Sequence, residues 1–118
     1  MSAITVKCSI DDRTIDLKRD SGSVAITTAA GNVDSRILSV GTSEEEHTFS
    51  ADIGNAGYVY IDNQDTTNFV DVGFATGVYP IRVKAGHPQL FSITPAQGSL
   101  FLKADTAACR VEVTVREA

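Results

Sequence analysis

Apolar and polar residues alternate along most of this chain with a period of two, which is the spacing of a β-strand that buries one face. The C-terminal segment shows the pattern most regularly, with apolar Cys109, Val111, Val113 and Val115 between polar Arg110, Glu112, Thr114 and Arg116. We expect one face of this strand to pack in the core and the other to meet water or a partner.

The N-terminal third repeats the pattern between polar breaks. A first strand is expected where Ile4, Val6, Cys8 and Ile10 alternate with polar residues, followed by a break at Asp11-Asp12-Arg13. Further strands are expected around Ile15 and Leu17, over Val24 to Ala30 after a turn at 20–23, and over Ser35 to Val40.

The stretch from Gly57 to Phe74 is predicted to form a hairpin at the centre of the fold. Tyr58 to Ile61 and Phe69 to Val72 are rich in aromatic and β-branched residues, which favour extended backbone. The seven residues between them, 62–68, are Asp, Asn, Gln and Thr. Such side chains can bond their own backbone and stabilise a reversal.

Three more strands are expected around Tyr79 to Val83, Leu90 to Thr94 and Leu100 to Lys103. Pro80 has no amide to donate to a ladder, which places it at a strand start, edge or bulge. The acidic run Glu44 to Glu46 follows Thr42 and Ser43, so at most one helical turn is expected there.

Short strands with turn signals about every ten residues predict an all-β fold. We expect a single-domain antiparallel β-sandwich, jelly-roll-like or Ig-like, over residues 1–118, because 118 residues are enough for one hydrophobic core.

Charge and hydropathy narrow the classes of partner. The formal net charge is −5, and nucleic-acid binding normally depends on clustered Lys and Arg, so neither DNA nor RNA is expected as a partner. No apolar run approaches the ~20 residues that span a bilayer, so no membrane association is expected. The N-terminus MSAITVKCSIDD lacks the segments of a signal peptide, which predicts synthesis and folding in a cytoplasm.

Candidate catalytic groups are dispersed along the sequence. His47 and His87 stand forty positions apart, outside any metal-ligand spacing, and are expected on the surface beside turns. Asp62, Asp65 and Asp71 could supply oxygen ligands for calcium, but their spacing matches no EF-hand loop. We therefore expect no catalytic residue, cofactor-binding residue or metal ligand, and a protein that is not an enzyme.

Cysteines and aromatic residues have structural interpretations. Cys8 and Cys109 are expected to be small buried hydrophobes, and a disulfide between the first and last strands is the alternative. Exposed aromatic side chains could anchor a partner, although core burial is the expectation for any one of them. The candidates are Tyr58, Tyr60, Phe74, Tyr79, Phe91 and Phe101.

Three stretches together resemble a family of small virion proteins of tailed bacteriophages. They are SVGTSEE at 39–45, GYVYIDNQDTTNFV at 57–70 and KADTAACRVE at 103–112. The resemblance implies a non-enzymatic component of the virus particle. In its last stretch, Asp105 and Thr106 suit a turn in which they bond local amides, and Ala107 and Ala108 permit close packing.

The leading expectation is a capsid decoration or cement protein that binds the outside of the head and bridges capsid subunits. Its expected partners are the major capsid protein or other virion structural proteins, with homo-oligomers in the particle. One alternative is a tail, collar or baseplate module that links virion proteins. The other is a carbohydrate-binding module, or a glycan-active enzyme, on the virion surface.

Overall fold

The computed structural model describes residues 2–28, 31–94 and 97–118, and within this part of the chain every regular element is a β-strand. The all-β class is therefore confirmed. The chain divides into two compact units, Met1–Gly31 and Asn32–Ala118, which are described separately. The expectation of one domain over residues 1–118 stays a prediction.

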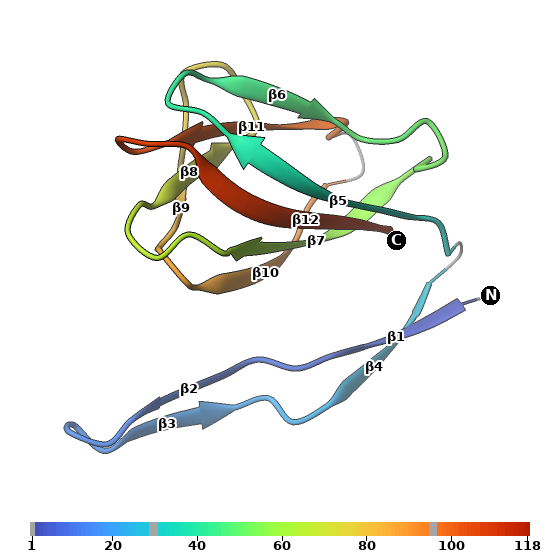
Figure 1. Ribbon diagram of the computed structural model, residues 1–118. Helices are drawn as coiled ribbons and strands as arrows, with labels where there is room; N and C mark the ends of the chain where they lie inside the picture. The colour runs from blue at the N-terminus through green and yellow to red at the C-terminus, as the bar shows by residue number, and fades with distance from the viewer. Residues whose placement is uncertain (1, 29–30, 95–96) are drawn as a thin grey trace. The chain divides into compact units, whose positions relative to one another are not determined.

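The second unit is a sandwich of two four-stranded antiparallel sheets, drawn as two layers in Figure 1. The first sheet has the order β10-β7-β12-β5, and the second has the order β6-β11-β8-β9. The strands are β5 (Val33–Val40), β6 (Glu45–Thr48), β7 (Ala56–Asn63), β8 (Val70–Gly73), β9 (Ile81–Val83), β10 (Pro88–Ser92), β11 (Ser99–Ala104) and β12 (Cys109–Glu117).

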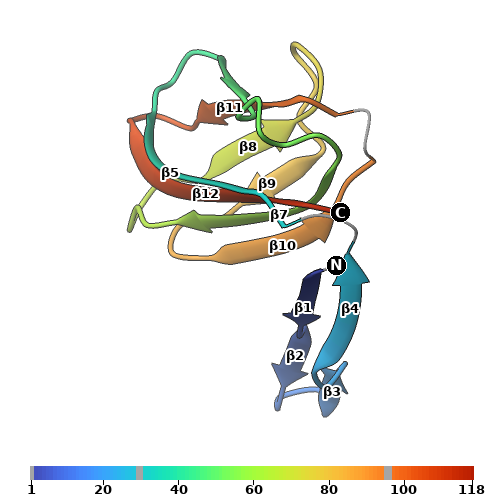
Figure 2. The same ribbon diagram turned by 90° about the vertical axis from the view of Figure 1, so that its right-hand side faces the viewer.

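The strands of this unit pair in nested order along the chain. β8 pairs with β9, β7 with β10, β6 with β11 and β5 with β12, all antiparallel. Successive pairs alternate between the two sheets. Figure 2 shows β11 and β8 in one layer and β12, β7 and β10 in the other. A ribbon of nested pairs wrapped into two sheets of four is the jelly-roll arrangement, and it decides between the jelly-roll-like and Ig-like alternatives.

Alternating side chains of both sheets fill the space between the layers. Val111, Val113 and Val115 of β12 are fully buried, as the sequence pattern predicted. They belong to one cluster with Ile61 of β7 and Leu102 of β11. Burying each such side chain stabilises the fold by about 1.5–3 kcal/mol, so this interface holds the two layers together.

The predicted hairpin over 57–74 is wrong in topology although both of its strands form. β7 and β8 lie in different sheets, and residues 64–69 carry the chain from one layer to the other. The crossing is fixed by Asn63, whose buried amide nitrogen donates to the carbonyl oxygens of Asn68 (2.9 Å) and Val83 (3.1 Å). The polar turn residues therefore support a crossover and not a two-stranded reversal.

The acidic run that was expected to allow one helical turn leads into a strand. Glu45 and Glu46 begin β6, in which His47 is buried opposite Leu100 of β11. Phe49, two residues further on, is also buried. The buried side chains of His47 and Phe49 are two residues apart, which is the spacing of a strand and not of a helix.

The first unit is one long hairpin of two strand pairs. β1 (Ser2–Val6) pairs with β4 (Val24–Thr28), and β2 (Ser9–Asp12) pairs with β3 (Leu17–Asp20). The partner of Val6 is Val24 and the partner of Ser9 is Asp20, so residues 7–8 face the three residues 21–23. This extra residue is a β-bulge, and Gly22 supplies its positive φ of 66°.

Candidate interaction surfaces

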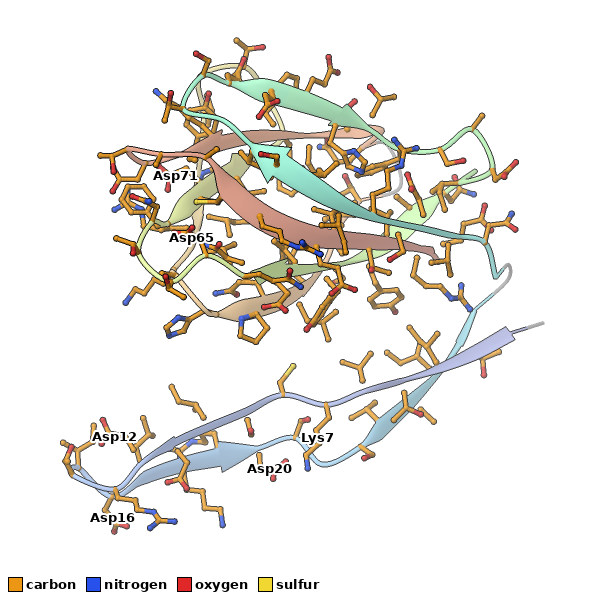
Figure 3. All side chains as sticks on the ribbon, in the orientation of Figure 1. Lys7, Asp12, Asp16, Asp20, Asp65 and Asp71 are labelled. Carbon is orange, nitrogen blue, oxygen red and sulfur yellow. The ribbon has the colours of Figure 1, made fainter. Side chains whose placement is uncertain are left out.

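The three aspartates considered as calcium ligands serve different purposes. Asp71 forms an ion pair with Arg82, with 2.8 Å between Oδ1 and Nε. Asp65 accepts hydrogen bonds from the amides of Asn68 (2.6 Å) and Thr67 (3.0 Å), which lower its pKa. Figure 3 labels Asp65 and Asp71 at the crossing and on β8. Across residues 2–28, 31–94 and 97–118, no three His, Cys, Asp or Glu side chains are grouped as a metal site.

The acidic run at 44–46 anchors neighbouring loops. The Oε1 atom of Glu44 accepts hydrogen bonds from the Tyr79 hydroxyl and from the Gly77 amide (2.7 Å), and these bonds lower the pKa of Glu44. The Oε2 atom of Glu45 accepts from the Gly41 amide. These carboxylates stabilise turns, and they are not arranged as an acid/base pair across a cleft.

The two histidines differ from each other. His87 is exposed, as expected for a residue beside a turn. The same expectation is wrong for His47, which is 6% exposed. Its Nε2 atom has no hydrogen-bond partner in the described structure and lies 4.0 Å from Oδ2 of Asp34. Burial lowers the pKa of His47, and the nearby carboxylate of Asp34 partly opposes that shift.

Asp34 is a buried carboxylate that sequence reasoning missed. Its Oδ1 accepts from Nε of Arg36 (2.9 Å), and its Oδ2 accepts from the amide of Ser50 (2.8 Å). The predicted strand began at Ser35, two residues after the start of β5 at Val33. Asp34 has the same parity as Leu38 and Val40, so a longer strand would have placed its side chain on the inner face.

The turn into β12 also departs from expectation. Its contacts are long-range: the Asp105 amide donates to the Phe69 carbonyl (3.1 Å), and the Thr106 hydroxyl donates to Oδ1 of Asn68 (2.7 Å). Ala107 and Ala108 are exposed and do not pack closely. This turn therefore holds the end of β11 to the crossing between β7 and β8.

Both cysteines are free thiols, so the alternative of a disulfide is not realised in this structure. Cys109 is fully buried in β12, as expected, and burial raises its pKa. Cys8 is exposed, which contradicts the expectation of a buried hydrophobe. Its backbone nitrogen donates to the Ser21 hydroxyl (3.0 Å) across the bulge.

None of the six candidate aromatic residues is fully buried. Tyr60 is exposed, which contradicts the expectation of core burial, and the other five are half-buried. Phe74 and Phe91 pack against the core cluster, which contains the buried Phe49. Phe74 and Phe91 meet edge to face at 6.3 Å between ring centroids, and they line a shallow groove with Ile81 and Ile93. Tyr60 is the most open of the six, at 37% exposed.

Apolar side chains gather on one face of the hairpin formed by residues 2–28, here called the hairpin arm. Ile4 pairs with Ile26, and Val6 pairs with Val24. Because side chains alternate along a strand, Cys8 and Ile10 continue the same face toward the tip. In Figure 3, Asp12 and Asp16 mark that tip, and Lys7 and Asp20 lie midway along the arm.

The hairpin arm has no core of its own. Between Ile4 and Thr27 no side chain is buried, and Ile10 is 57% exposed. A single two-stranded hairpin is marginally stable in water, so its apolar face needs a cover.

A second open surface is the outward side of the β10-β7-β12-β5 sheet, here called the outer face. Register places its side chains in rows across the strands. One row contains Leu90, Tyr60, Thr114 and Ser35, the next contains Pro88, Asp62, Glu112 and Ile37, and the third contains Ser92, Tyr58, Arg116 and Val33.

The hairpin arm and the outer face together carry most of the exposed large apolar side chains. Eight such side chains are found in the described residues: Ile10, Ile15 and Val24 in the arm, Val33, Ile37, Tyr60 and Leu90 on the outer face, and Val78 elsewhere. Clustered exposed apolar side chains mark contact surfaces more often than scattered ones do.

Comparisons of the chain with protein-family models, with curated proteins and with solved structures gave no match. In the described residues there is no helix with the length and apolar character to cross a membrane. The arguments about function therefore rest on the fold and its surfaces.

Proposed function

We propose that this chain is a bacteriophage capsid decoration or cement protein, which binds the outside of the head and bridges capsid subunits. Its jelly-roll sandwich is an architecture that viral capsid domains also use. Fold alone does not determine function, so the proposal also needs support from the residues themselves.

The observation that carries the proposal is the convergence of the three resembling stretches. The Ala104 amide donates to the Gly41 carbonyl (2.8 Å), which joins the last stretch to the first. The Gln64 amide donates to the Arg110 carbonyl (2.9 Å), which joins the middle stretch to the last. These two hydrogen bonds connect segments that are far apart in the sequence, and the proposal takes the three stretches as parts of one structural unit.

The surfaces fit a role in binding rather than in catalysis. The outer face and the hairpin arm offer apolar contact area, and the candidate catalytic side chains instead hold turns and loops. A protein that binds only the assembled lattice stabilises that lattice by mass action. A cement protein needs no other chemistry than this.

The test is the location and copy number of the chain in purified particles. A decoration protein is expected in tailless heads at hundreds of copies, whereas a tail ring holds about a dozen by symmetry. Quantitative mass spectrometry of separated heads and tails, with imaging of the particle, measures both. Confinement to the tail fraction would reject the proposal in favour of a tail, collar or baseplate module.

A further inference from the structure

Two uncovered apolar surfaces of similar character occur in the same chain. The hairpin arm presents Ile10 and Val24, which are 57% and 45% exposed. The outer face presents Ile37 at 57% and Leu90 at 37%. Both are the faces of antiparallel β-structure, which pack against each other at about 10 Å when their side chains interdigitate.

One charge on the hairpin arm matches a local pair of opposite charges on the outer face, which elsewhere carries Arg110 and Arg116 along β12. On the outer face, Asp62 stands directly opposite Glu112, and like charges in that position are destabilising. Neither carboxylate belongs to an ion pair among the described residues. On the hairpin arm, Arg19 pairs directly with Ile10, and its guanidinium is exposed. The guanidinium of Arg19, beside Ile10, can therefore neutralise the two carboxylates that lie in the same row as Ile37.

We propose that the apolar face of the hairpin arm packs on the outer face of a second copy of this chain, and that the second copy returns its arm in the same way. Ile10 and Val24 of one copy then cover the Tyr60 and Leu90 row of the other. Arg19 lies against the carboxylates of Asp62 and Glu112 and offsets their repulsion.

The area available favours reciprocal exchange over a single contact. From Ile4 to Asp12 the arm runs nine residues, so its face measures roughly 30 Å by 10 Å at ~3.3 Å per residue and ~4.8 Å per strand. One docked arm therefore buries on the order of 600 Å² from both sides, which is below a stable interface. Two exchanged arms bury on the order of 1,200 Å², which reaches the range of specific dimers.

The exchange also explains the amphipathic sequence of the hairpin arm. The contact is isologous, because each copy supplies one arm and one outer face. It brings together the two places where the exposed apolar residues cluster, and it leaves the charged face of the arm, with Lys7 and Lys18, in water.

The experiment uses the exposed thiol that the hairpin arm already carries. In the full chain, Leu90→Cys places a second thiol on the outer face, within reach of Cys8 of a docked arm. Lys103→Cys, an exposed position on β11 of the other sheet, is the matched control. Each variant is oxidised with diamide and analysed by non-reducing electrophoresis, with a mixture of long-tagged and untagged chains to identify links between chains.

We expect covalent dimers, including mixed tagged and untagged dimers, for Leu90→Cys and few for Lys103→Cys or the unsubstituted chain. A Leu90→Cys link formed only within one chain would overturn the proposal, because the arm would then cover its own outer face. Equal crosslinking of Leu90→Cys and Lys103→Cys would overturn it as well.

Sedimentation equilibrium gives an independent measure. Ile10→Asp is expected to raise the dimer dissociation constant by about tenfold or more, because each copy loses a buried apolar anchor. Thr5→Asp, on the opposite face of the same arm, is expected to leave it unchanged. A chain that is monomeric at all concentrations, or an equal effect of the two substitutions, would contradict the exchange. Cooperative urea unfolding of each variant checks that the sandwich is folded.

Discussion

At the residue scale, a few buried polar side chains fix the geometry of the loops. Asn63 is fully buried, and its side chain donates to two carbonyl oxygens and accepts from the Asp65 amide (3.1 Å). Glu117 accepts from the amides of Gly54 (2.6 Å) and Asn32 (3.3 Å) at the other end of the sandwich. Buried polar groups are costly unless they are satisfied, so these bonds favour one loop arrangement over the alternatives.

His47 gives the sandwich a pH-dependent stability. Burial holds its pKa below the usual range, so the unfolded chain binds a proton that the folded chain does not. The free energy of unfolding is therefore highest above about pH 6.5. It falls as the pH drops from there toward the lowered pKa of His47, by at most about 1.4 kcal/mol per pH unit.

Urea unfolding of the wild type and of His47→Gln between pH 5 and pH 8 measures this effect. We expect the difference in stability between the two proteins to change with pH in favour of the wild type at the upper end. His87→Gln, at an exposed position, is the control and should follow the wild type. Parallel pH profiles for the wild type and His47→Gln would show that His47 is not the titrating group.

The alternation of residues predicted the buried apolar side chains better than the buried polar ones. Val111, Val113 and Val115 are buried as their alternation indicated. His47 was missed because a histidine does not register as an apolar position in a period-two pattern. Asp34 could have been placed inside by its parity with Val40, but its partner Ser50 lies in a loop that sequence cannot position.

At the element scale, most strands were predicted and their pairing was not. The exceptions are β6, which was not expected, and the segment around Ile15, which was expected as a strand but lies in the turn between β2 and β3. β5 pairs over its full length with residues 109–116 of β12, although the two strands lie at opposite ends of the sandwich sequence. Local pattern determines whether a segment is extended, but its partner is decided by which faces must be buried together. For this reason the pattern of residues 57–74 predicts a hairpin, whereas the chain crosses between the two sheets there.

The turn between β8 and β9 depends on a glycine for a steric reason. A Cβ atom at Gly73 would lie 1.7 Å from the carbonyl oxygen of Val78, which is backbone and cannot move aside alone. Val78 is itself held there by a bridge to Ala75. We expect Gly73→Ala to lower the free energy of unfolding by about 3 kcal/mol or more.

The matched control is Gly98→Ala, because a Cβ atom at Gly98 meets no other atom within 4 Å. Its effect should stay within about 0.5 kcal/mol, as for most surface substitutions. Chemical denaturation of the two variants measures both values. Similar stabilities for Gly73→Ala and Gly98→Ala would show that the β8–β9 turn adapts without cost.

At the scale of the whole molecule, the net negative charge and the hydrophobic core cluster both lie in the second unit. Residues 1–31 contain four Lys or Arg and four Asp residues, so the formal charge of −5 belongs to residues 32–118. The buried core cluster also lies entirely within the second unit, between Val40 and Val115. The arm carries no net charge, so it adds no long-range repulsion between two copies of the chain.

A chain spanning residues 32–118 is therefore expected to fold by itself. Its unfolding should remain cooperative, with a free energy within about 1 kcal/mol of the monomeric full chain, because removal of the arm takes nothing from the core cluster. A peptide of residues 1–31 should be unstructured in water. Circular dichroism and urea titration test both; loss of cooperative unfolding in residues 32–118 would show that the arm contributes to the core.

Alternation of apolar and polar residues was enough to predict that this protein is built from strands, because a period of two in apolar side chains is a local property of each segment. It also determined most of the buried face of β12. The nested pairing, the burial of His47 beside Asp34 and the division of the chain into two units became visible only in the folded structure. These features depend on contacts between residues far apart in the chain, whose energies appear only when the layers meet.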